Sequence, residues 1–206
     1  ERVIAGGVHG VFLLGTTGEA PSLSERLKRN LISRAIEIVD GRIKVLVGIT
    51  DTSLVDSLEL AAYATEERAD ALVVAPPPYF PIHQADLRAY VETLAEGGGL
   101  PVFLYNMPSH SKVAFEIGTV RQLLHHPKIA GLKDSSGNML YFNQVVQLAQ
   151  ERPSFHVFIG PEELLAESVL VGGRGGICGG ANLYPELYVE LYNAAANGDL
   201  AAIHKL

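Results

Sequence analysis

The sequence predicts an α/β fold of the parallel (β/α)₈ barrel type. Seven short apolar runs, rich in Val, Ile, Leu and Phe, alternate with longer amphipathic segments along the whole chain. Most of these runs lack polar alternation, which is typical of strands buried on both faces. Neighbouring runs are about 30 residues apart, the size of one repeated βα unit. A closed barrel is therefore favoured over the alternative, an open doubly wound sheet.

The predicted strands are the apolar runs themselves: GVFLLG at 10–15, KVLVGI at 44–49, ALVVAP at 71–76, PVFLY at 101–105, IAGLK at 129–133, HVFIG at 156–160 and GGICG at 175–179. The predicted helices are the amphipathic segments that follow them, at residues 24–40, 54–68, 84–96, 116–125, 139–150, 162–171 and 185–197. Ser24 begins the first of these segments and is suited to cap the free N–H groups of a helix.

The predicted barrel is shorter than a complete one. A closed barrel of this type needs eight strands and about 250 residues. The chain has 206 residues with no break in composition, so residues 1–206 are expected to form a single barrel domain. The residues after Glu1 resemble the inside of a helix, and Leu206 falls within another helical pattern. The domain is therefore expected to be incomplete at both ends, without the first strand and the C-terminal helices.

Composition and charge exclude several classes of partner. The net charge is −7 and no basic residues cluster, which argues against nucleic acid and acidic membrane surfaces. No apolar run approaches the roughly 20 residues that a membrane-spanning helix needs. Cys178 is the only cysteine and can form no intrachain disulfide, while the histidines show no metal-ligand spacing. We expect a cytoplasmic protein without a metal cofactor.

Lys133 ends one of the apolar strands, in the run IAGLKDSSG at residues 129–137. An ammonium group placed there is hard to solvate, and desolvation lowers the pKa of a lysine. A neutral amine can act as the nucleophile that forms a Schiff base. Taken alone, the pattern also fits a strand-end lysine that extends into water. Alternation places Ile129 and Gly131 on the same face as Lys133, and Gly131 leaves space there for a ligand or a bulky neighbour.

Tyr105 ends the preceding strand, within the run YNMP at residues 105–108. Alternation places Phe103 and Tyr105 on one face of that strand. If this face points into the barrel, the Tyr105 hydroxyl lies at its mouth and could act as a general acid and base within reach of Lys133. The alternative is a core tyrosine whose hydroxyl bonds to a backbone carbonyl.

Two loops after strands are further candidates. The loop GTTGE at residues 15–19 carries the hydroxyls of Thr16 and Thr17 and free backbone N–H groups, which can hold a small carboxylate or simply form a βα turn. The run PPPYFP at residues 76–81 could present Tyr79 to a site or to a neighbouring subunit, or be a rigid exposed loop. The glycines at 172–176 precede the last strand and are interpreted as a tight turn away from the active face.

Three motifs at strand ends, taken together and in their order along the chain, resemble those of the dihydrodipicolinate synthase/N-acetylneuraminate lyase family. Members of this family are pyruvate-dependent class I aldolases and lyases of (β/α)₈ fold. The motifs are GTTGE at 15–19, YNMP at 105–108 and GLKDSSG at 131–137, and the resemblance covers essentially the whole chain. It implies an enzyme that condenses pyruvate with an aldehyde or cleaves a 2-keto (sugar) acid to pyruvate. It further implies a covalent imine in place of a cofactor, small-molecule substrates and a homotetramer.

The resemblance assigns roles by position. Lys133 is similar to the lysine that forms an imine with the keto carbon of pyruvate, and Tyr105 to the tyrosine that shuttles protons. Thr16 and Thr17 match the pair that binds the pyruvate carboxylate, with Thr16 also linked to Tyr105. Tyr79 matches a relay tyrosine that tetrameric members receive from the adjacent subunit. The pocket around the imine is implied to be lined by Gly160 and Ile177.

The resemblance leaves the second substrate open. The synthase branch usually carries arginine two residues after the proline of the tyrosine motif, where this chain has His110, which lacks the forked geometry of arginine. The sialic-acid lyase branch uses an acidic pair, for which Glu162 and Glu163 could serve, and a hydroxyl in the eighth strand, where this chain has Cys178 and two glycines.

Several functional hypotheses follow. A sugar-acid aldolase, for example one acting on 2-keto-3-deoxygluconate, is compatible with both departures. Dihydrodipicolinate synthase proper, that is 4-hydroxy-tetrahydrodipicolinate synthase, is the first alternative. A non-catalytic paralogue that binds a keto acid, or an inactive fragment, is the alternative of another class, although simple binding needs no imine-forming lysine.

Overall fold

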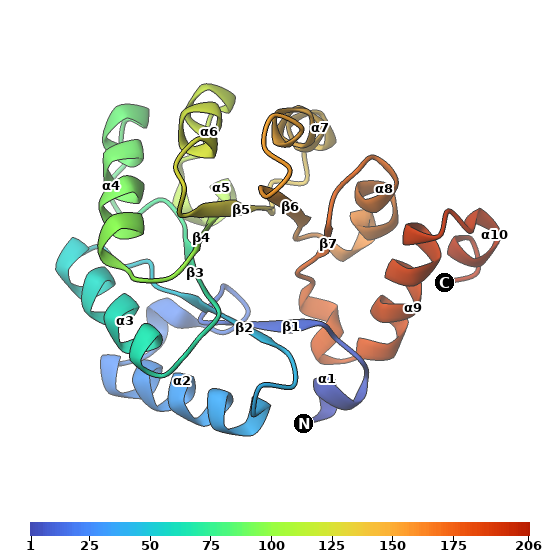
Figure 1. The fold of residues 1–206 in the computed structure, drawn as a ribbon, viewed down its shortest axis with the longest axis horizontal. Helices are drawn as coiled ribbons and strands as arrows, with labels where there is room; N and C mark the ends of the chain where they lie inside the picture. The colour runs from blue at the N-terminus through green and yellow to red at the C-terminus, as the bar shows by residue number, and fades with distance from the viewer.

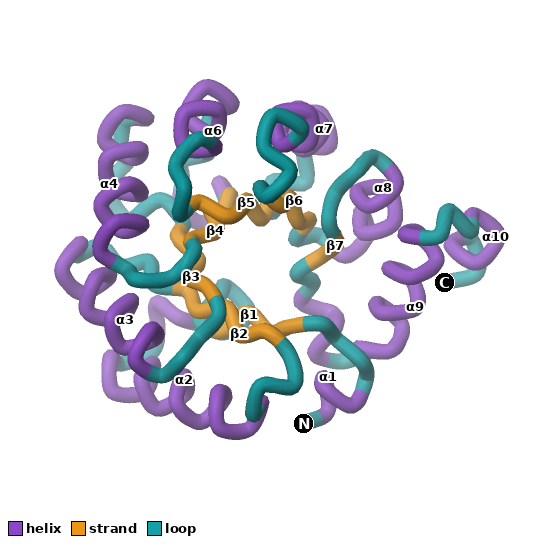
Figure 2. Tube along the Cα trace, viewed as in Figure 1, coloured by secondary structure: helices purple, strands orange, loops and turns teal.

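Seven parallel strands form one sheet in which each strand pairs with the next along the chain. The computed structural model describes residues 1–206. The sheet curls into a ring with helices around its outside (Figure 1), and the strands form the inner ring when viewed end-on (Figure 2). The strands are β1 (Gly10–Leu13), β2 (Lys44–Gly48), β3 (Ala71–Val74), β4 (Val102–Asn106), β5 (Ile129–Asp134), β6 (His156–Ile159) and β7 (Gly175–Gly176).

Helices lie between successive strands, before β1 and after β7. They are α1 (Arg2–Ala5), η1 (Ala20–Ser22), α2 (Glu25–Val39), α3 (Leu54–Glu66), α4 (Gln84–Gly97), α5 (Pro108–Ser111), α6 (Ile117–Leu124), α7 (Met139–Ala149), η2 (Glu162–Leu164), α8 (Leu165–Leu170), η3 (Gly179–Asn182), α9 (Pro185–Ala196) and α10 (Leu200–Ile203). As predicted, Ser24 caps α2, since its hydroxyl accepts a hydrogen bond from the Leu27 N–H at 3.4 Å. No helix is both long enough and apolar enough to cross a membrane.

The predicted α/β class and strand order are confirmed, but the ring is open. β1 pairs only with β2, and β7 pairs only with β6, so these two strands are the edges of the sheet. They face each other across the open side of the ring in Figure 2. The expectation that an upstream strand and C-terminal helices are missing stays a prediction.

Two predicted elements differ from the structure. The strand expected at 175–179 ends at Gly176, because the chain turns into the 3₁₀-helix η3 at Gly179. The single helix expected at 162–171 is instead the short 3₁₀-helix η2 followed by α8, and this segment begins directly after Pro161, whose backbone is extended. In both places the chain changes direction near the mouth of the barrel.

The hydrophobic core lies between the sheet and the surrounding helices, and it fixes which strand residues face inward. On β4, Leu104 is fully buried in this core while Phe103 and Tyr105 line the interior of the ring, as alternation predicts. The prediction for β5 is wrong at Ile129, which packs in the core while Ala130 lines the interior. An irregularity in the pairing of β4 with β5 shifts the register there and breaks the alternation.

Parallel pairing brings the carboxyl ends of the strands to one end of the ring. The register pairs Tyr105 with Lys133 and Asn106 with Asp134, so the last two residues of β4 lie beside the last two of β5. Lys133 in turn pairs with Phe158 on β6. The loops that follow β1, β6 and β7 begin at the same end of the ring. They carry most of the other predicted site residues, while Tyr79 follows β3 and His110 follows β4.

Candidate active site

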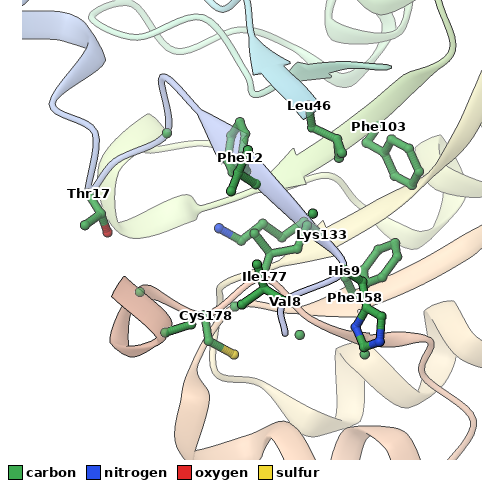
Figure 3. A pocket seen from close by; sticks show the side chains of 18 of the residues that line it. Val8, His9, Phe12, Thr17, Leu46, Phe103, Lys133, Phe158, Ile177 and Cys178 are labelled. Atoms are coloured by element: carbon green, nitrogen blue, oxygen red, sulfur yellow. The ribbon is translucent and has the colours of Figure 1, made fainter. Parts of the chain in front are cut away.

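A cavity of about 1080 Å³ occupies the interior of the ring, and Lys133 projects into it. At the end where the strands terminate, it is lined by Thr16, Thr17, Tyr105 and Lys133. Figure 3 shows the Lys133 amine pointing toward the side of the cavity where Thr17 lies. Four residues predicted from three separate segments of the sequence therefore share one cavity.

Lys133 is desolvated, as the strand-end pattern predicts. Only 7% of the residue is exposed, so it does not extend into water. Its Nζ atom lies 4.3 Å from the centroid of the Tyr105 ring and 5.1 Å from that of Phe12. Aromatic faces favour a cation, and the Tyr105 hydroxyl, Cys178 and Glu162 also act to raise the lysine pKa, but burial outweighs them and lowers it. The amine is therefore more readily neutral than that of an exposed lysine.

Tyr105 links Lys133 to the loop after β1. Its hydroxyl shares a hydrogen bond of 3.1 Å with Oγ1 of Thr16, so the alternative of a backbone carbonyl partner is wrong. The Phe12 ring packs edge-on against the Tyr105 ring, with centroids 5.7 Å apart and an interplanar angle of 88°. Phe12 thus fixes the tyrosine ring from below. The sequence carries a signal for Phe12, because alternation along the first strand separates the residues that face inward from those that face the helices. That signal was not used in the prediction.

Two glycines, Gly131 within β5 and Gly160 directly after β6, stand where a side chain would clash with the walls of the site. A Cβ atom on Gly131 would clash with the backbone carbonyl of His156 on β6 and would lie 2.7 Å from Cε1 of Phe103, so the neighbouring backbone and this ring fill the space next to Gly131. A Cβ on Gly160, at the end of β6, would lie 1.9 Å from the Ser135 hydroxyl. A larger residue at Gly131 would displace the β6 backbone or the Phe103 ring, and one at Gly160 would displace Ser135 in the loop after Lys133.

The loops after β6 and β7 close the other side of the cavity. Gly160 and Ile177 line it, as the resemblance implies, and Glu162 and Cys178 line it as well. Burial and the negative charge of Glu162 raise the pKa of the Cys178 thiol to about 12. The thiol therefore stays protonated near neutral pH and contributes bulk rather than a nucleophile.

Three predicted residues lie outside the cavity in this single chain. Tyr79 is 83% exposed, has a positive φ of 83°, and packs edge-on against Phe80. His110 is exposed on the short helix α5, where its Nδ1 atom shares a hydrogen bond of 2.9 Å with the Ser109 hydroxyl. Glu163 is exposed beside Glu162. The roles predicted for Tyr79 and His110 stay predictions.

The glycine-rich segment before β7 is a turn at the amino end of that strand, as predicted. Gly172 and Gly175 have positive φ angles of 106° and 147°, and the Gly173 N–H donates to the Ser168 carbonyl at 2.8 Å. The backbone of this segment faces the end of the cavity opposite Lys133.

Comparison with known proteins defines the class of enzyme. Residues 1–206 match the model of the dihydrodipicolinate synthetase family. The chain is 36% identical over 203 residues to a probable 2-dehydro-3-deoxy-D-pentonate aldolase of Escherichia coli, which covers 98% of this chain and 67% of the relative. It is 35% identical over 208 residues to the 4-hydroxy-tetrahydrodipicolinate synthase of Methanopyrus kandleri, which covers 100% of this chain and 68% of the relative.

Solved structures agree with this result. The dihydrodipicolinate synthase of Bacteroides thetaiotaomicron is 48% identical with a TM-score of 0.95, over 99% of this chain and 68% of that one. YagE, a prophage protein of the same family from E. coli solved in complex with pyruvate, is 31% identical with a TM-score of 0.95, over 99% of this chain and 69% of that one. These relatives, together with the curled parallel sheet, define the protein as an enzyme of the lyase and aldolase class. The chain belongs to the dihydrodipicolinate synthetase family.

Proposed function

We propose that this protein is a Schiff-base aldolase in which Nζ of Lys133 attacks the keto carbon of pyruvate. The observation that supports the proposal best is the desolvated Lys133 amine, which lies inside the cavity 4.3 Å from the Tyr105 ring. A nucleophilic amine must be neutral, and burial moves its pKa in the required direction. The imine itself serves as the electron sink, so the proposed reaction needs no separate cofactor.

The proposed reaction needs protons moved at several atoms. Attack by Nζ gives a carbinolamine, whose hydroxyl leaves as water after Tyr105 supplies a proton. The resulting iminium then loses a proton from its methyl group and becomes an enamine. The enamine carbon attacks the carbonyl carbon of an aldehyde, and water finally hydrolyses the imine and frees Lys133; cleavage is the reverse. The hydrogen bond between Tyr105 and Thr16 gives the shuttled proton a route toward the loop after β1.

The loop at residues 15–19 is the proposed site for the pyruvate carboxylate. Thr16 and Thr17 line the cavity at this loop, and both are accessible to solvent. Hydroxyl and backbone N–H donors hold a small carboxylate without a buried countercharge. A carboxylate bound there places the adjacent keto carbon of pyruvate on the side toward which the Lys133 amine points (Figure 3).

For the second substrate, we propose a polyhydroxy aldehyde, so that the cleaved substrate is a 2-keto-3-deoxy sugar acid. Glu162 lines the cavity while His110 lies outside it. A carboxylate can accept hydrogen bonds from sugar hydroxyls but repels a second carboxylate. The relative from E. coli named as a probable 2-dehydro-3-deoxy-D-pentonate aldolase supports this choice. Dihydrodipicolinate synthase proper is the second candidate, supported by the 48% identical structure.

A substrate comparison separates these candidates. Purified protein would be assayed for pyruvate released from a series of 2-keto-3-deoxy sugar acids, and for consumption of L-aspartate semialdehyde in the presence of pyruvate. Faster turnover of a sugar acid supports the proposal. Faster turnover of the semialdehyde assigns the chain to the synthase activity, and pyruvate binding without either turnover supports the non-catalytic paralogue.

We further propose a cytoplasmic homotetramer in which the segment around Tyr79 packs against another subunit. Two adjacent aromatic residues, Tyr79 and Phe80, are 83% and 74% exposed, which is unusual unless they are covered in an assembly. Analytical ultracentrifugation of the protein and of its Tyr79→Ala variant tests this. A monomeric wild-type protein contradicts the proposal.

The lowered pKa of Lys133 predicts a specific pH dependence. Because only the neutral amine attacks pyruvate, the rate of imine formation at saturating pyruvate should rise with pH and level off below the usual lysine pKa of about 10.4. The measurement is the rate of formation of the borohydride-trapped adduct from about pH 6 to about pH 11, in steps of about one pH unit. A rate that still rises through about pH 10.4 would show that Lys133 titrates like an exposed lysine.

A further inference from the structure

Asn106 and Asp134 form a second pair of polar side chains. Asn106 directly follows Tyr105 on β4, and Asp134 directly follows Lys133 on β5. Asn106 and Asp134 are 1% and 0% exposed. Nδ2 of Asn106 donates to Oδ1 of Asp134 at 2.8 Å, and the two residues are partners in the register of β4 and β5, immediately after the partners Tyr105 and Lys133. This hydrogen bond therefore joins the two strand ends just where the proposed nucleophile and proton donor leave them.

Further hydrogen bonds tie this pair to the loops that follow both strands. Oδ1 of Asn106 accepts the Phe115 N–H at 3.0 Å, which fixes the end of the segment 107–115. The Asp134 carboxylate accepts the Ser136 N–H at 3.1 Å and the Ser136 hydroxyl at 2.9 Å. One buried cluster thus joins β4, β5, the end of the segment 107–115 and the beginning of the loop after β5.

Stability alone gives a weak reason for this pair. The side-chain hydrogen bonds of the Asp134 carboxylate come from Asn106 and Ser136 and not from a cation, and burial raises the pKa of this carboxyl group. The nearby Tyr141 hydroxyl is also buried and has no hydrogen-bond partner. Replacing buried charged groups by apolar ones of similar shape is often neutral or stabilising. The charge of Asp134 is also not among the groups that shift the pKa of Lys133, which are Tyr105, Cys178 and Glu162.

We propose that Asn106 and Asp134 are positioning residues, which hold Tyr105 and Lys133 at the mutual placement that imine chemistry requires. This inference rests on the proposed function. The pair acts through the backbone, because each member immediately follows one of the reacting residues on its strand. Reactions of this kind are sensitive to placement, and a shift of about 1 Å can cost about 10² in rate.

The Asn106→Ala variant tests the proposal. It removes the side-chain hydrogen bond between β4 and β5 and leaves the backbone pairing of the two strands and the side chains of Tyr105 and Lys133 unchanged in sequence. We expect the rate of borohydride-trapped adduct at saturating pyruvate, expressed per folded protein, to fall by about tenfold or more. The half-saturating pyruvate concentration and the pH midpoint of trapping should change little, because the carboxylate loop is not part of the cluster and Lys133 remains buried.

Two further variants separate positioning from loss of stability. Ser111→Ala is the matched control, since its buried hydroxyl donates to the carbonyls of Met107 and Val113 in the same segment and makes no bond to β5. We expect its trapping rate per folded protein to stay within about twofold of the wild type. The single change Asn106→Asp places two carboxyl groups opposite each other and should lower the trapping rate. The double change Asn106→Asp with Asp134→Asn again places an amide donor opposite a carboxylate acceptor, so it should recover part of that lost rate.

The outcomes distinguish this inference from the function on which it rests. A wild-type protein that forms no adduct overturns both. A wild-type protein that forms the adduct, with an Asn106→Ala variant equally fast per folded protein, overturns the positioning role and leaves the function in place. A shifted pH midpoint in Asn106→Ala would also contradict it, since the pair would then act on the lysine pKa.

Discussion

Replacement of Lys133 by arginine should abolish the trapped pyruvyl adduct and reduce turnover by on the order of 10⁴ to 10⁶. Arginine keeps a long cationic side chain at this position. Its guanidinium group stays protonated near neutral pH and cannot attack a carbonyl. Any residual activity would come from binding and from the hydroxyl groups of Tyr105 and Thr16. Mass spectrometry of the borohydride-treated protein and a pyruvate-release assay are the two measurements.

The control for this change is Lys205→Arg, because Lys205 is exposed near the end of the chain, away from the cavity. It should label and turn over as the wild type does. A Lys133→Arg variant that still gives a pyruvyl adduct on another lysine would assign the nucleophile elsewhere. A Lys133→Arg variant with more than about one tenth of wild-type turnover would rule out covalent catalysis by Lys133.

Replacement of Tyr105 by phenylalanine should have the second largest effect, a loss of about 10² to 10⁴ in kcat. The phenylalanine ring keeps the packing against Phe12 and the Lys133 amine, whereas the hydroxyl that bonds to Thr16 is lost. The half-saturating pyruvate concentration should change by less than about threefold, because the proposed carboxylate site is on the loop at residues 15–19. Steady-state kinetics measures both constants.

Tyr192→Phe is the matched control for Tyr105→Phe. Tyr192 also lines the cavity, but its ring packs edge-on against His9, which precedes β1 at the opposite end of the barrel. This variant should keep wild-type kcat. If Tyr105→Phe retains more than about a third of wild-type kcat, protons reach the intermediates by another route and the proposed relay fails.

The parts of the site that follow from local patterns could be predicted from the sequence. An apolar run marks each strand, and the last residue of a strand in a parallel barrel lies at the mouth. Lys133, Tyr105 and the threonines of residues 15–19 were found in this way, and all line one cavity. The inward direction of Phe103 and Tyr105 follows from simple alternation because β4 is regular up to its end.

Features that depend on register or on neighbouring strands could not be predicted. The irregular pairing of β4 with β5 moved Ile129 into the core, and a single sequence carries no signal for such a shift. The hydrogen bond between Asn106 and Asp134 requires knowing which residues lie side by side on two strands. The place of Cys178 on the cavity wall depends on how the chain passes from β7 into η3, and a single sequence does not give the direction of that turn. Tyr79 is exposed here, so its role depends on whether another subunit covers it.

The central claim, an imine between pyruvate and Lys133, is tested most directly by borohydride trapping. The protein would be incubated with pyruvate, reduced, and examined by intact mass and peptide mapping, with a sample lacking pyruvate as the reference. The account predicts one reduced pyruvyl group per chain, located on the peptide that contains Lys133. A folded protein that acquires no adduct, or acquires it on a different lysine, would contradict the account.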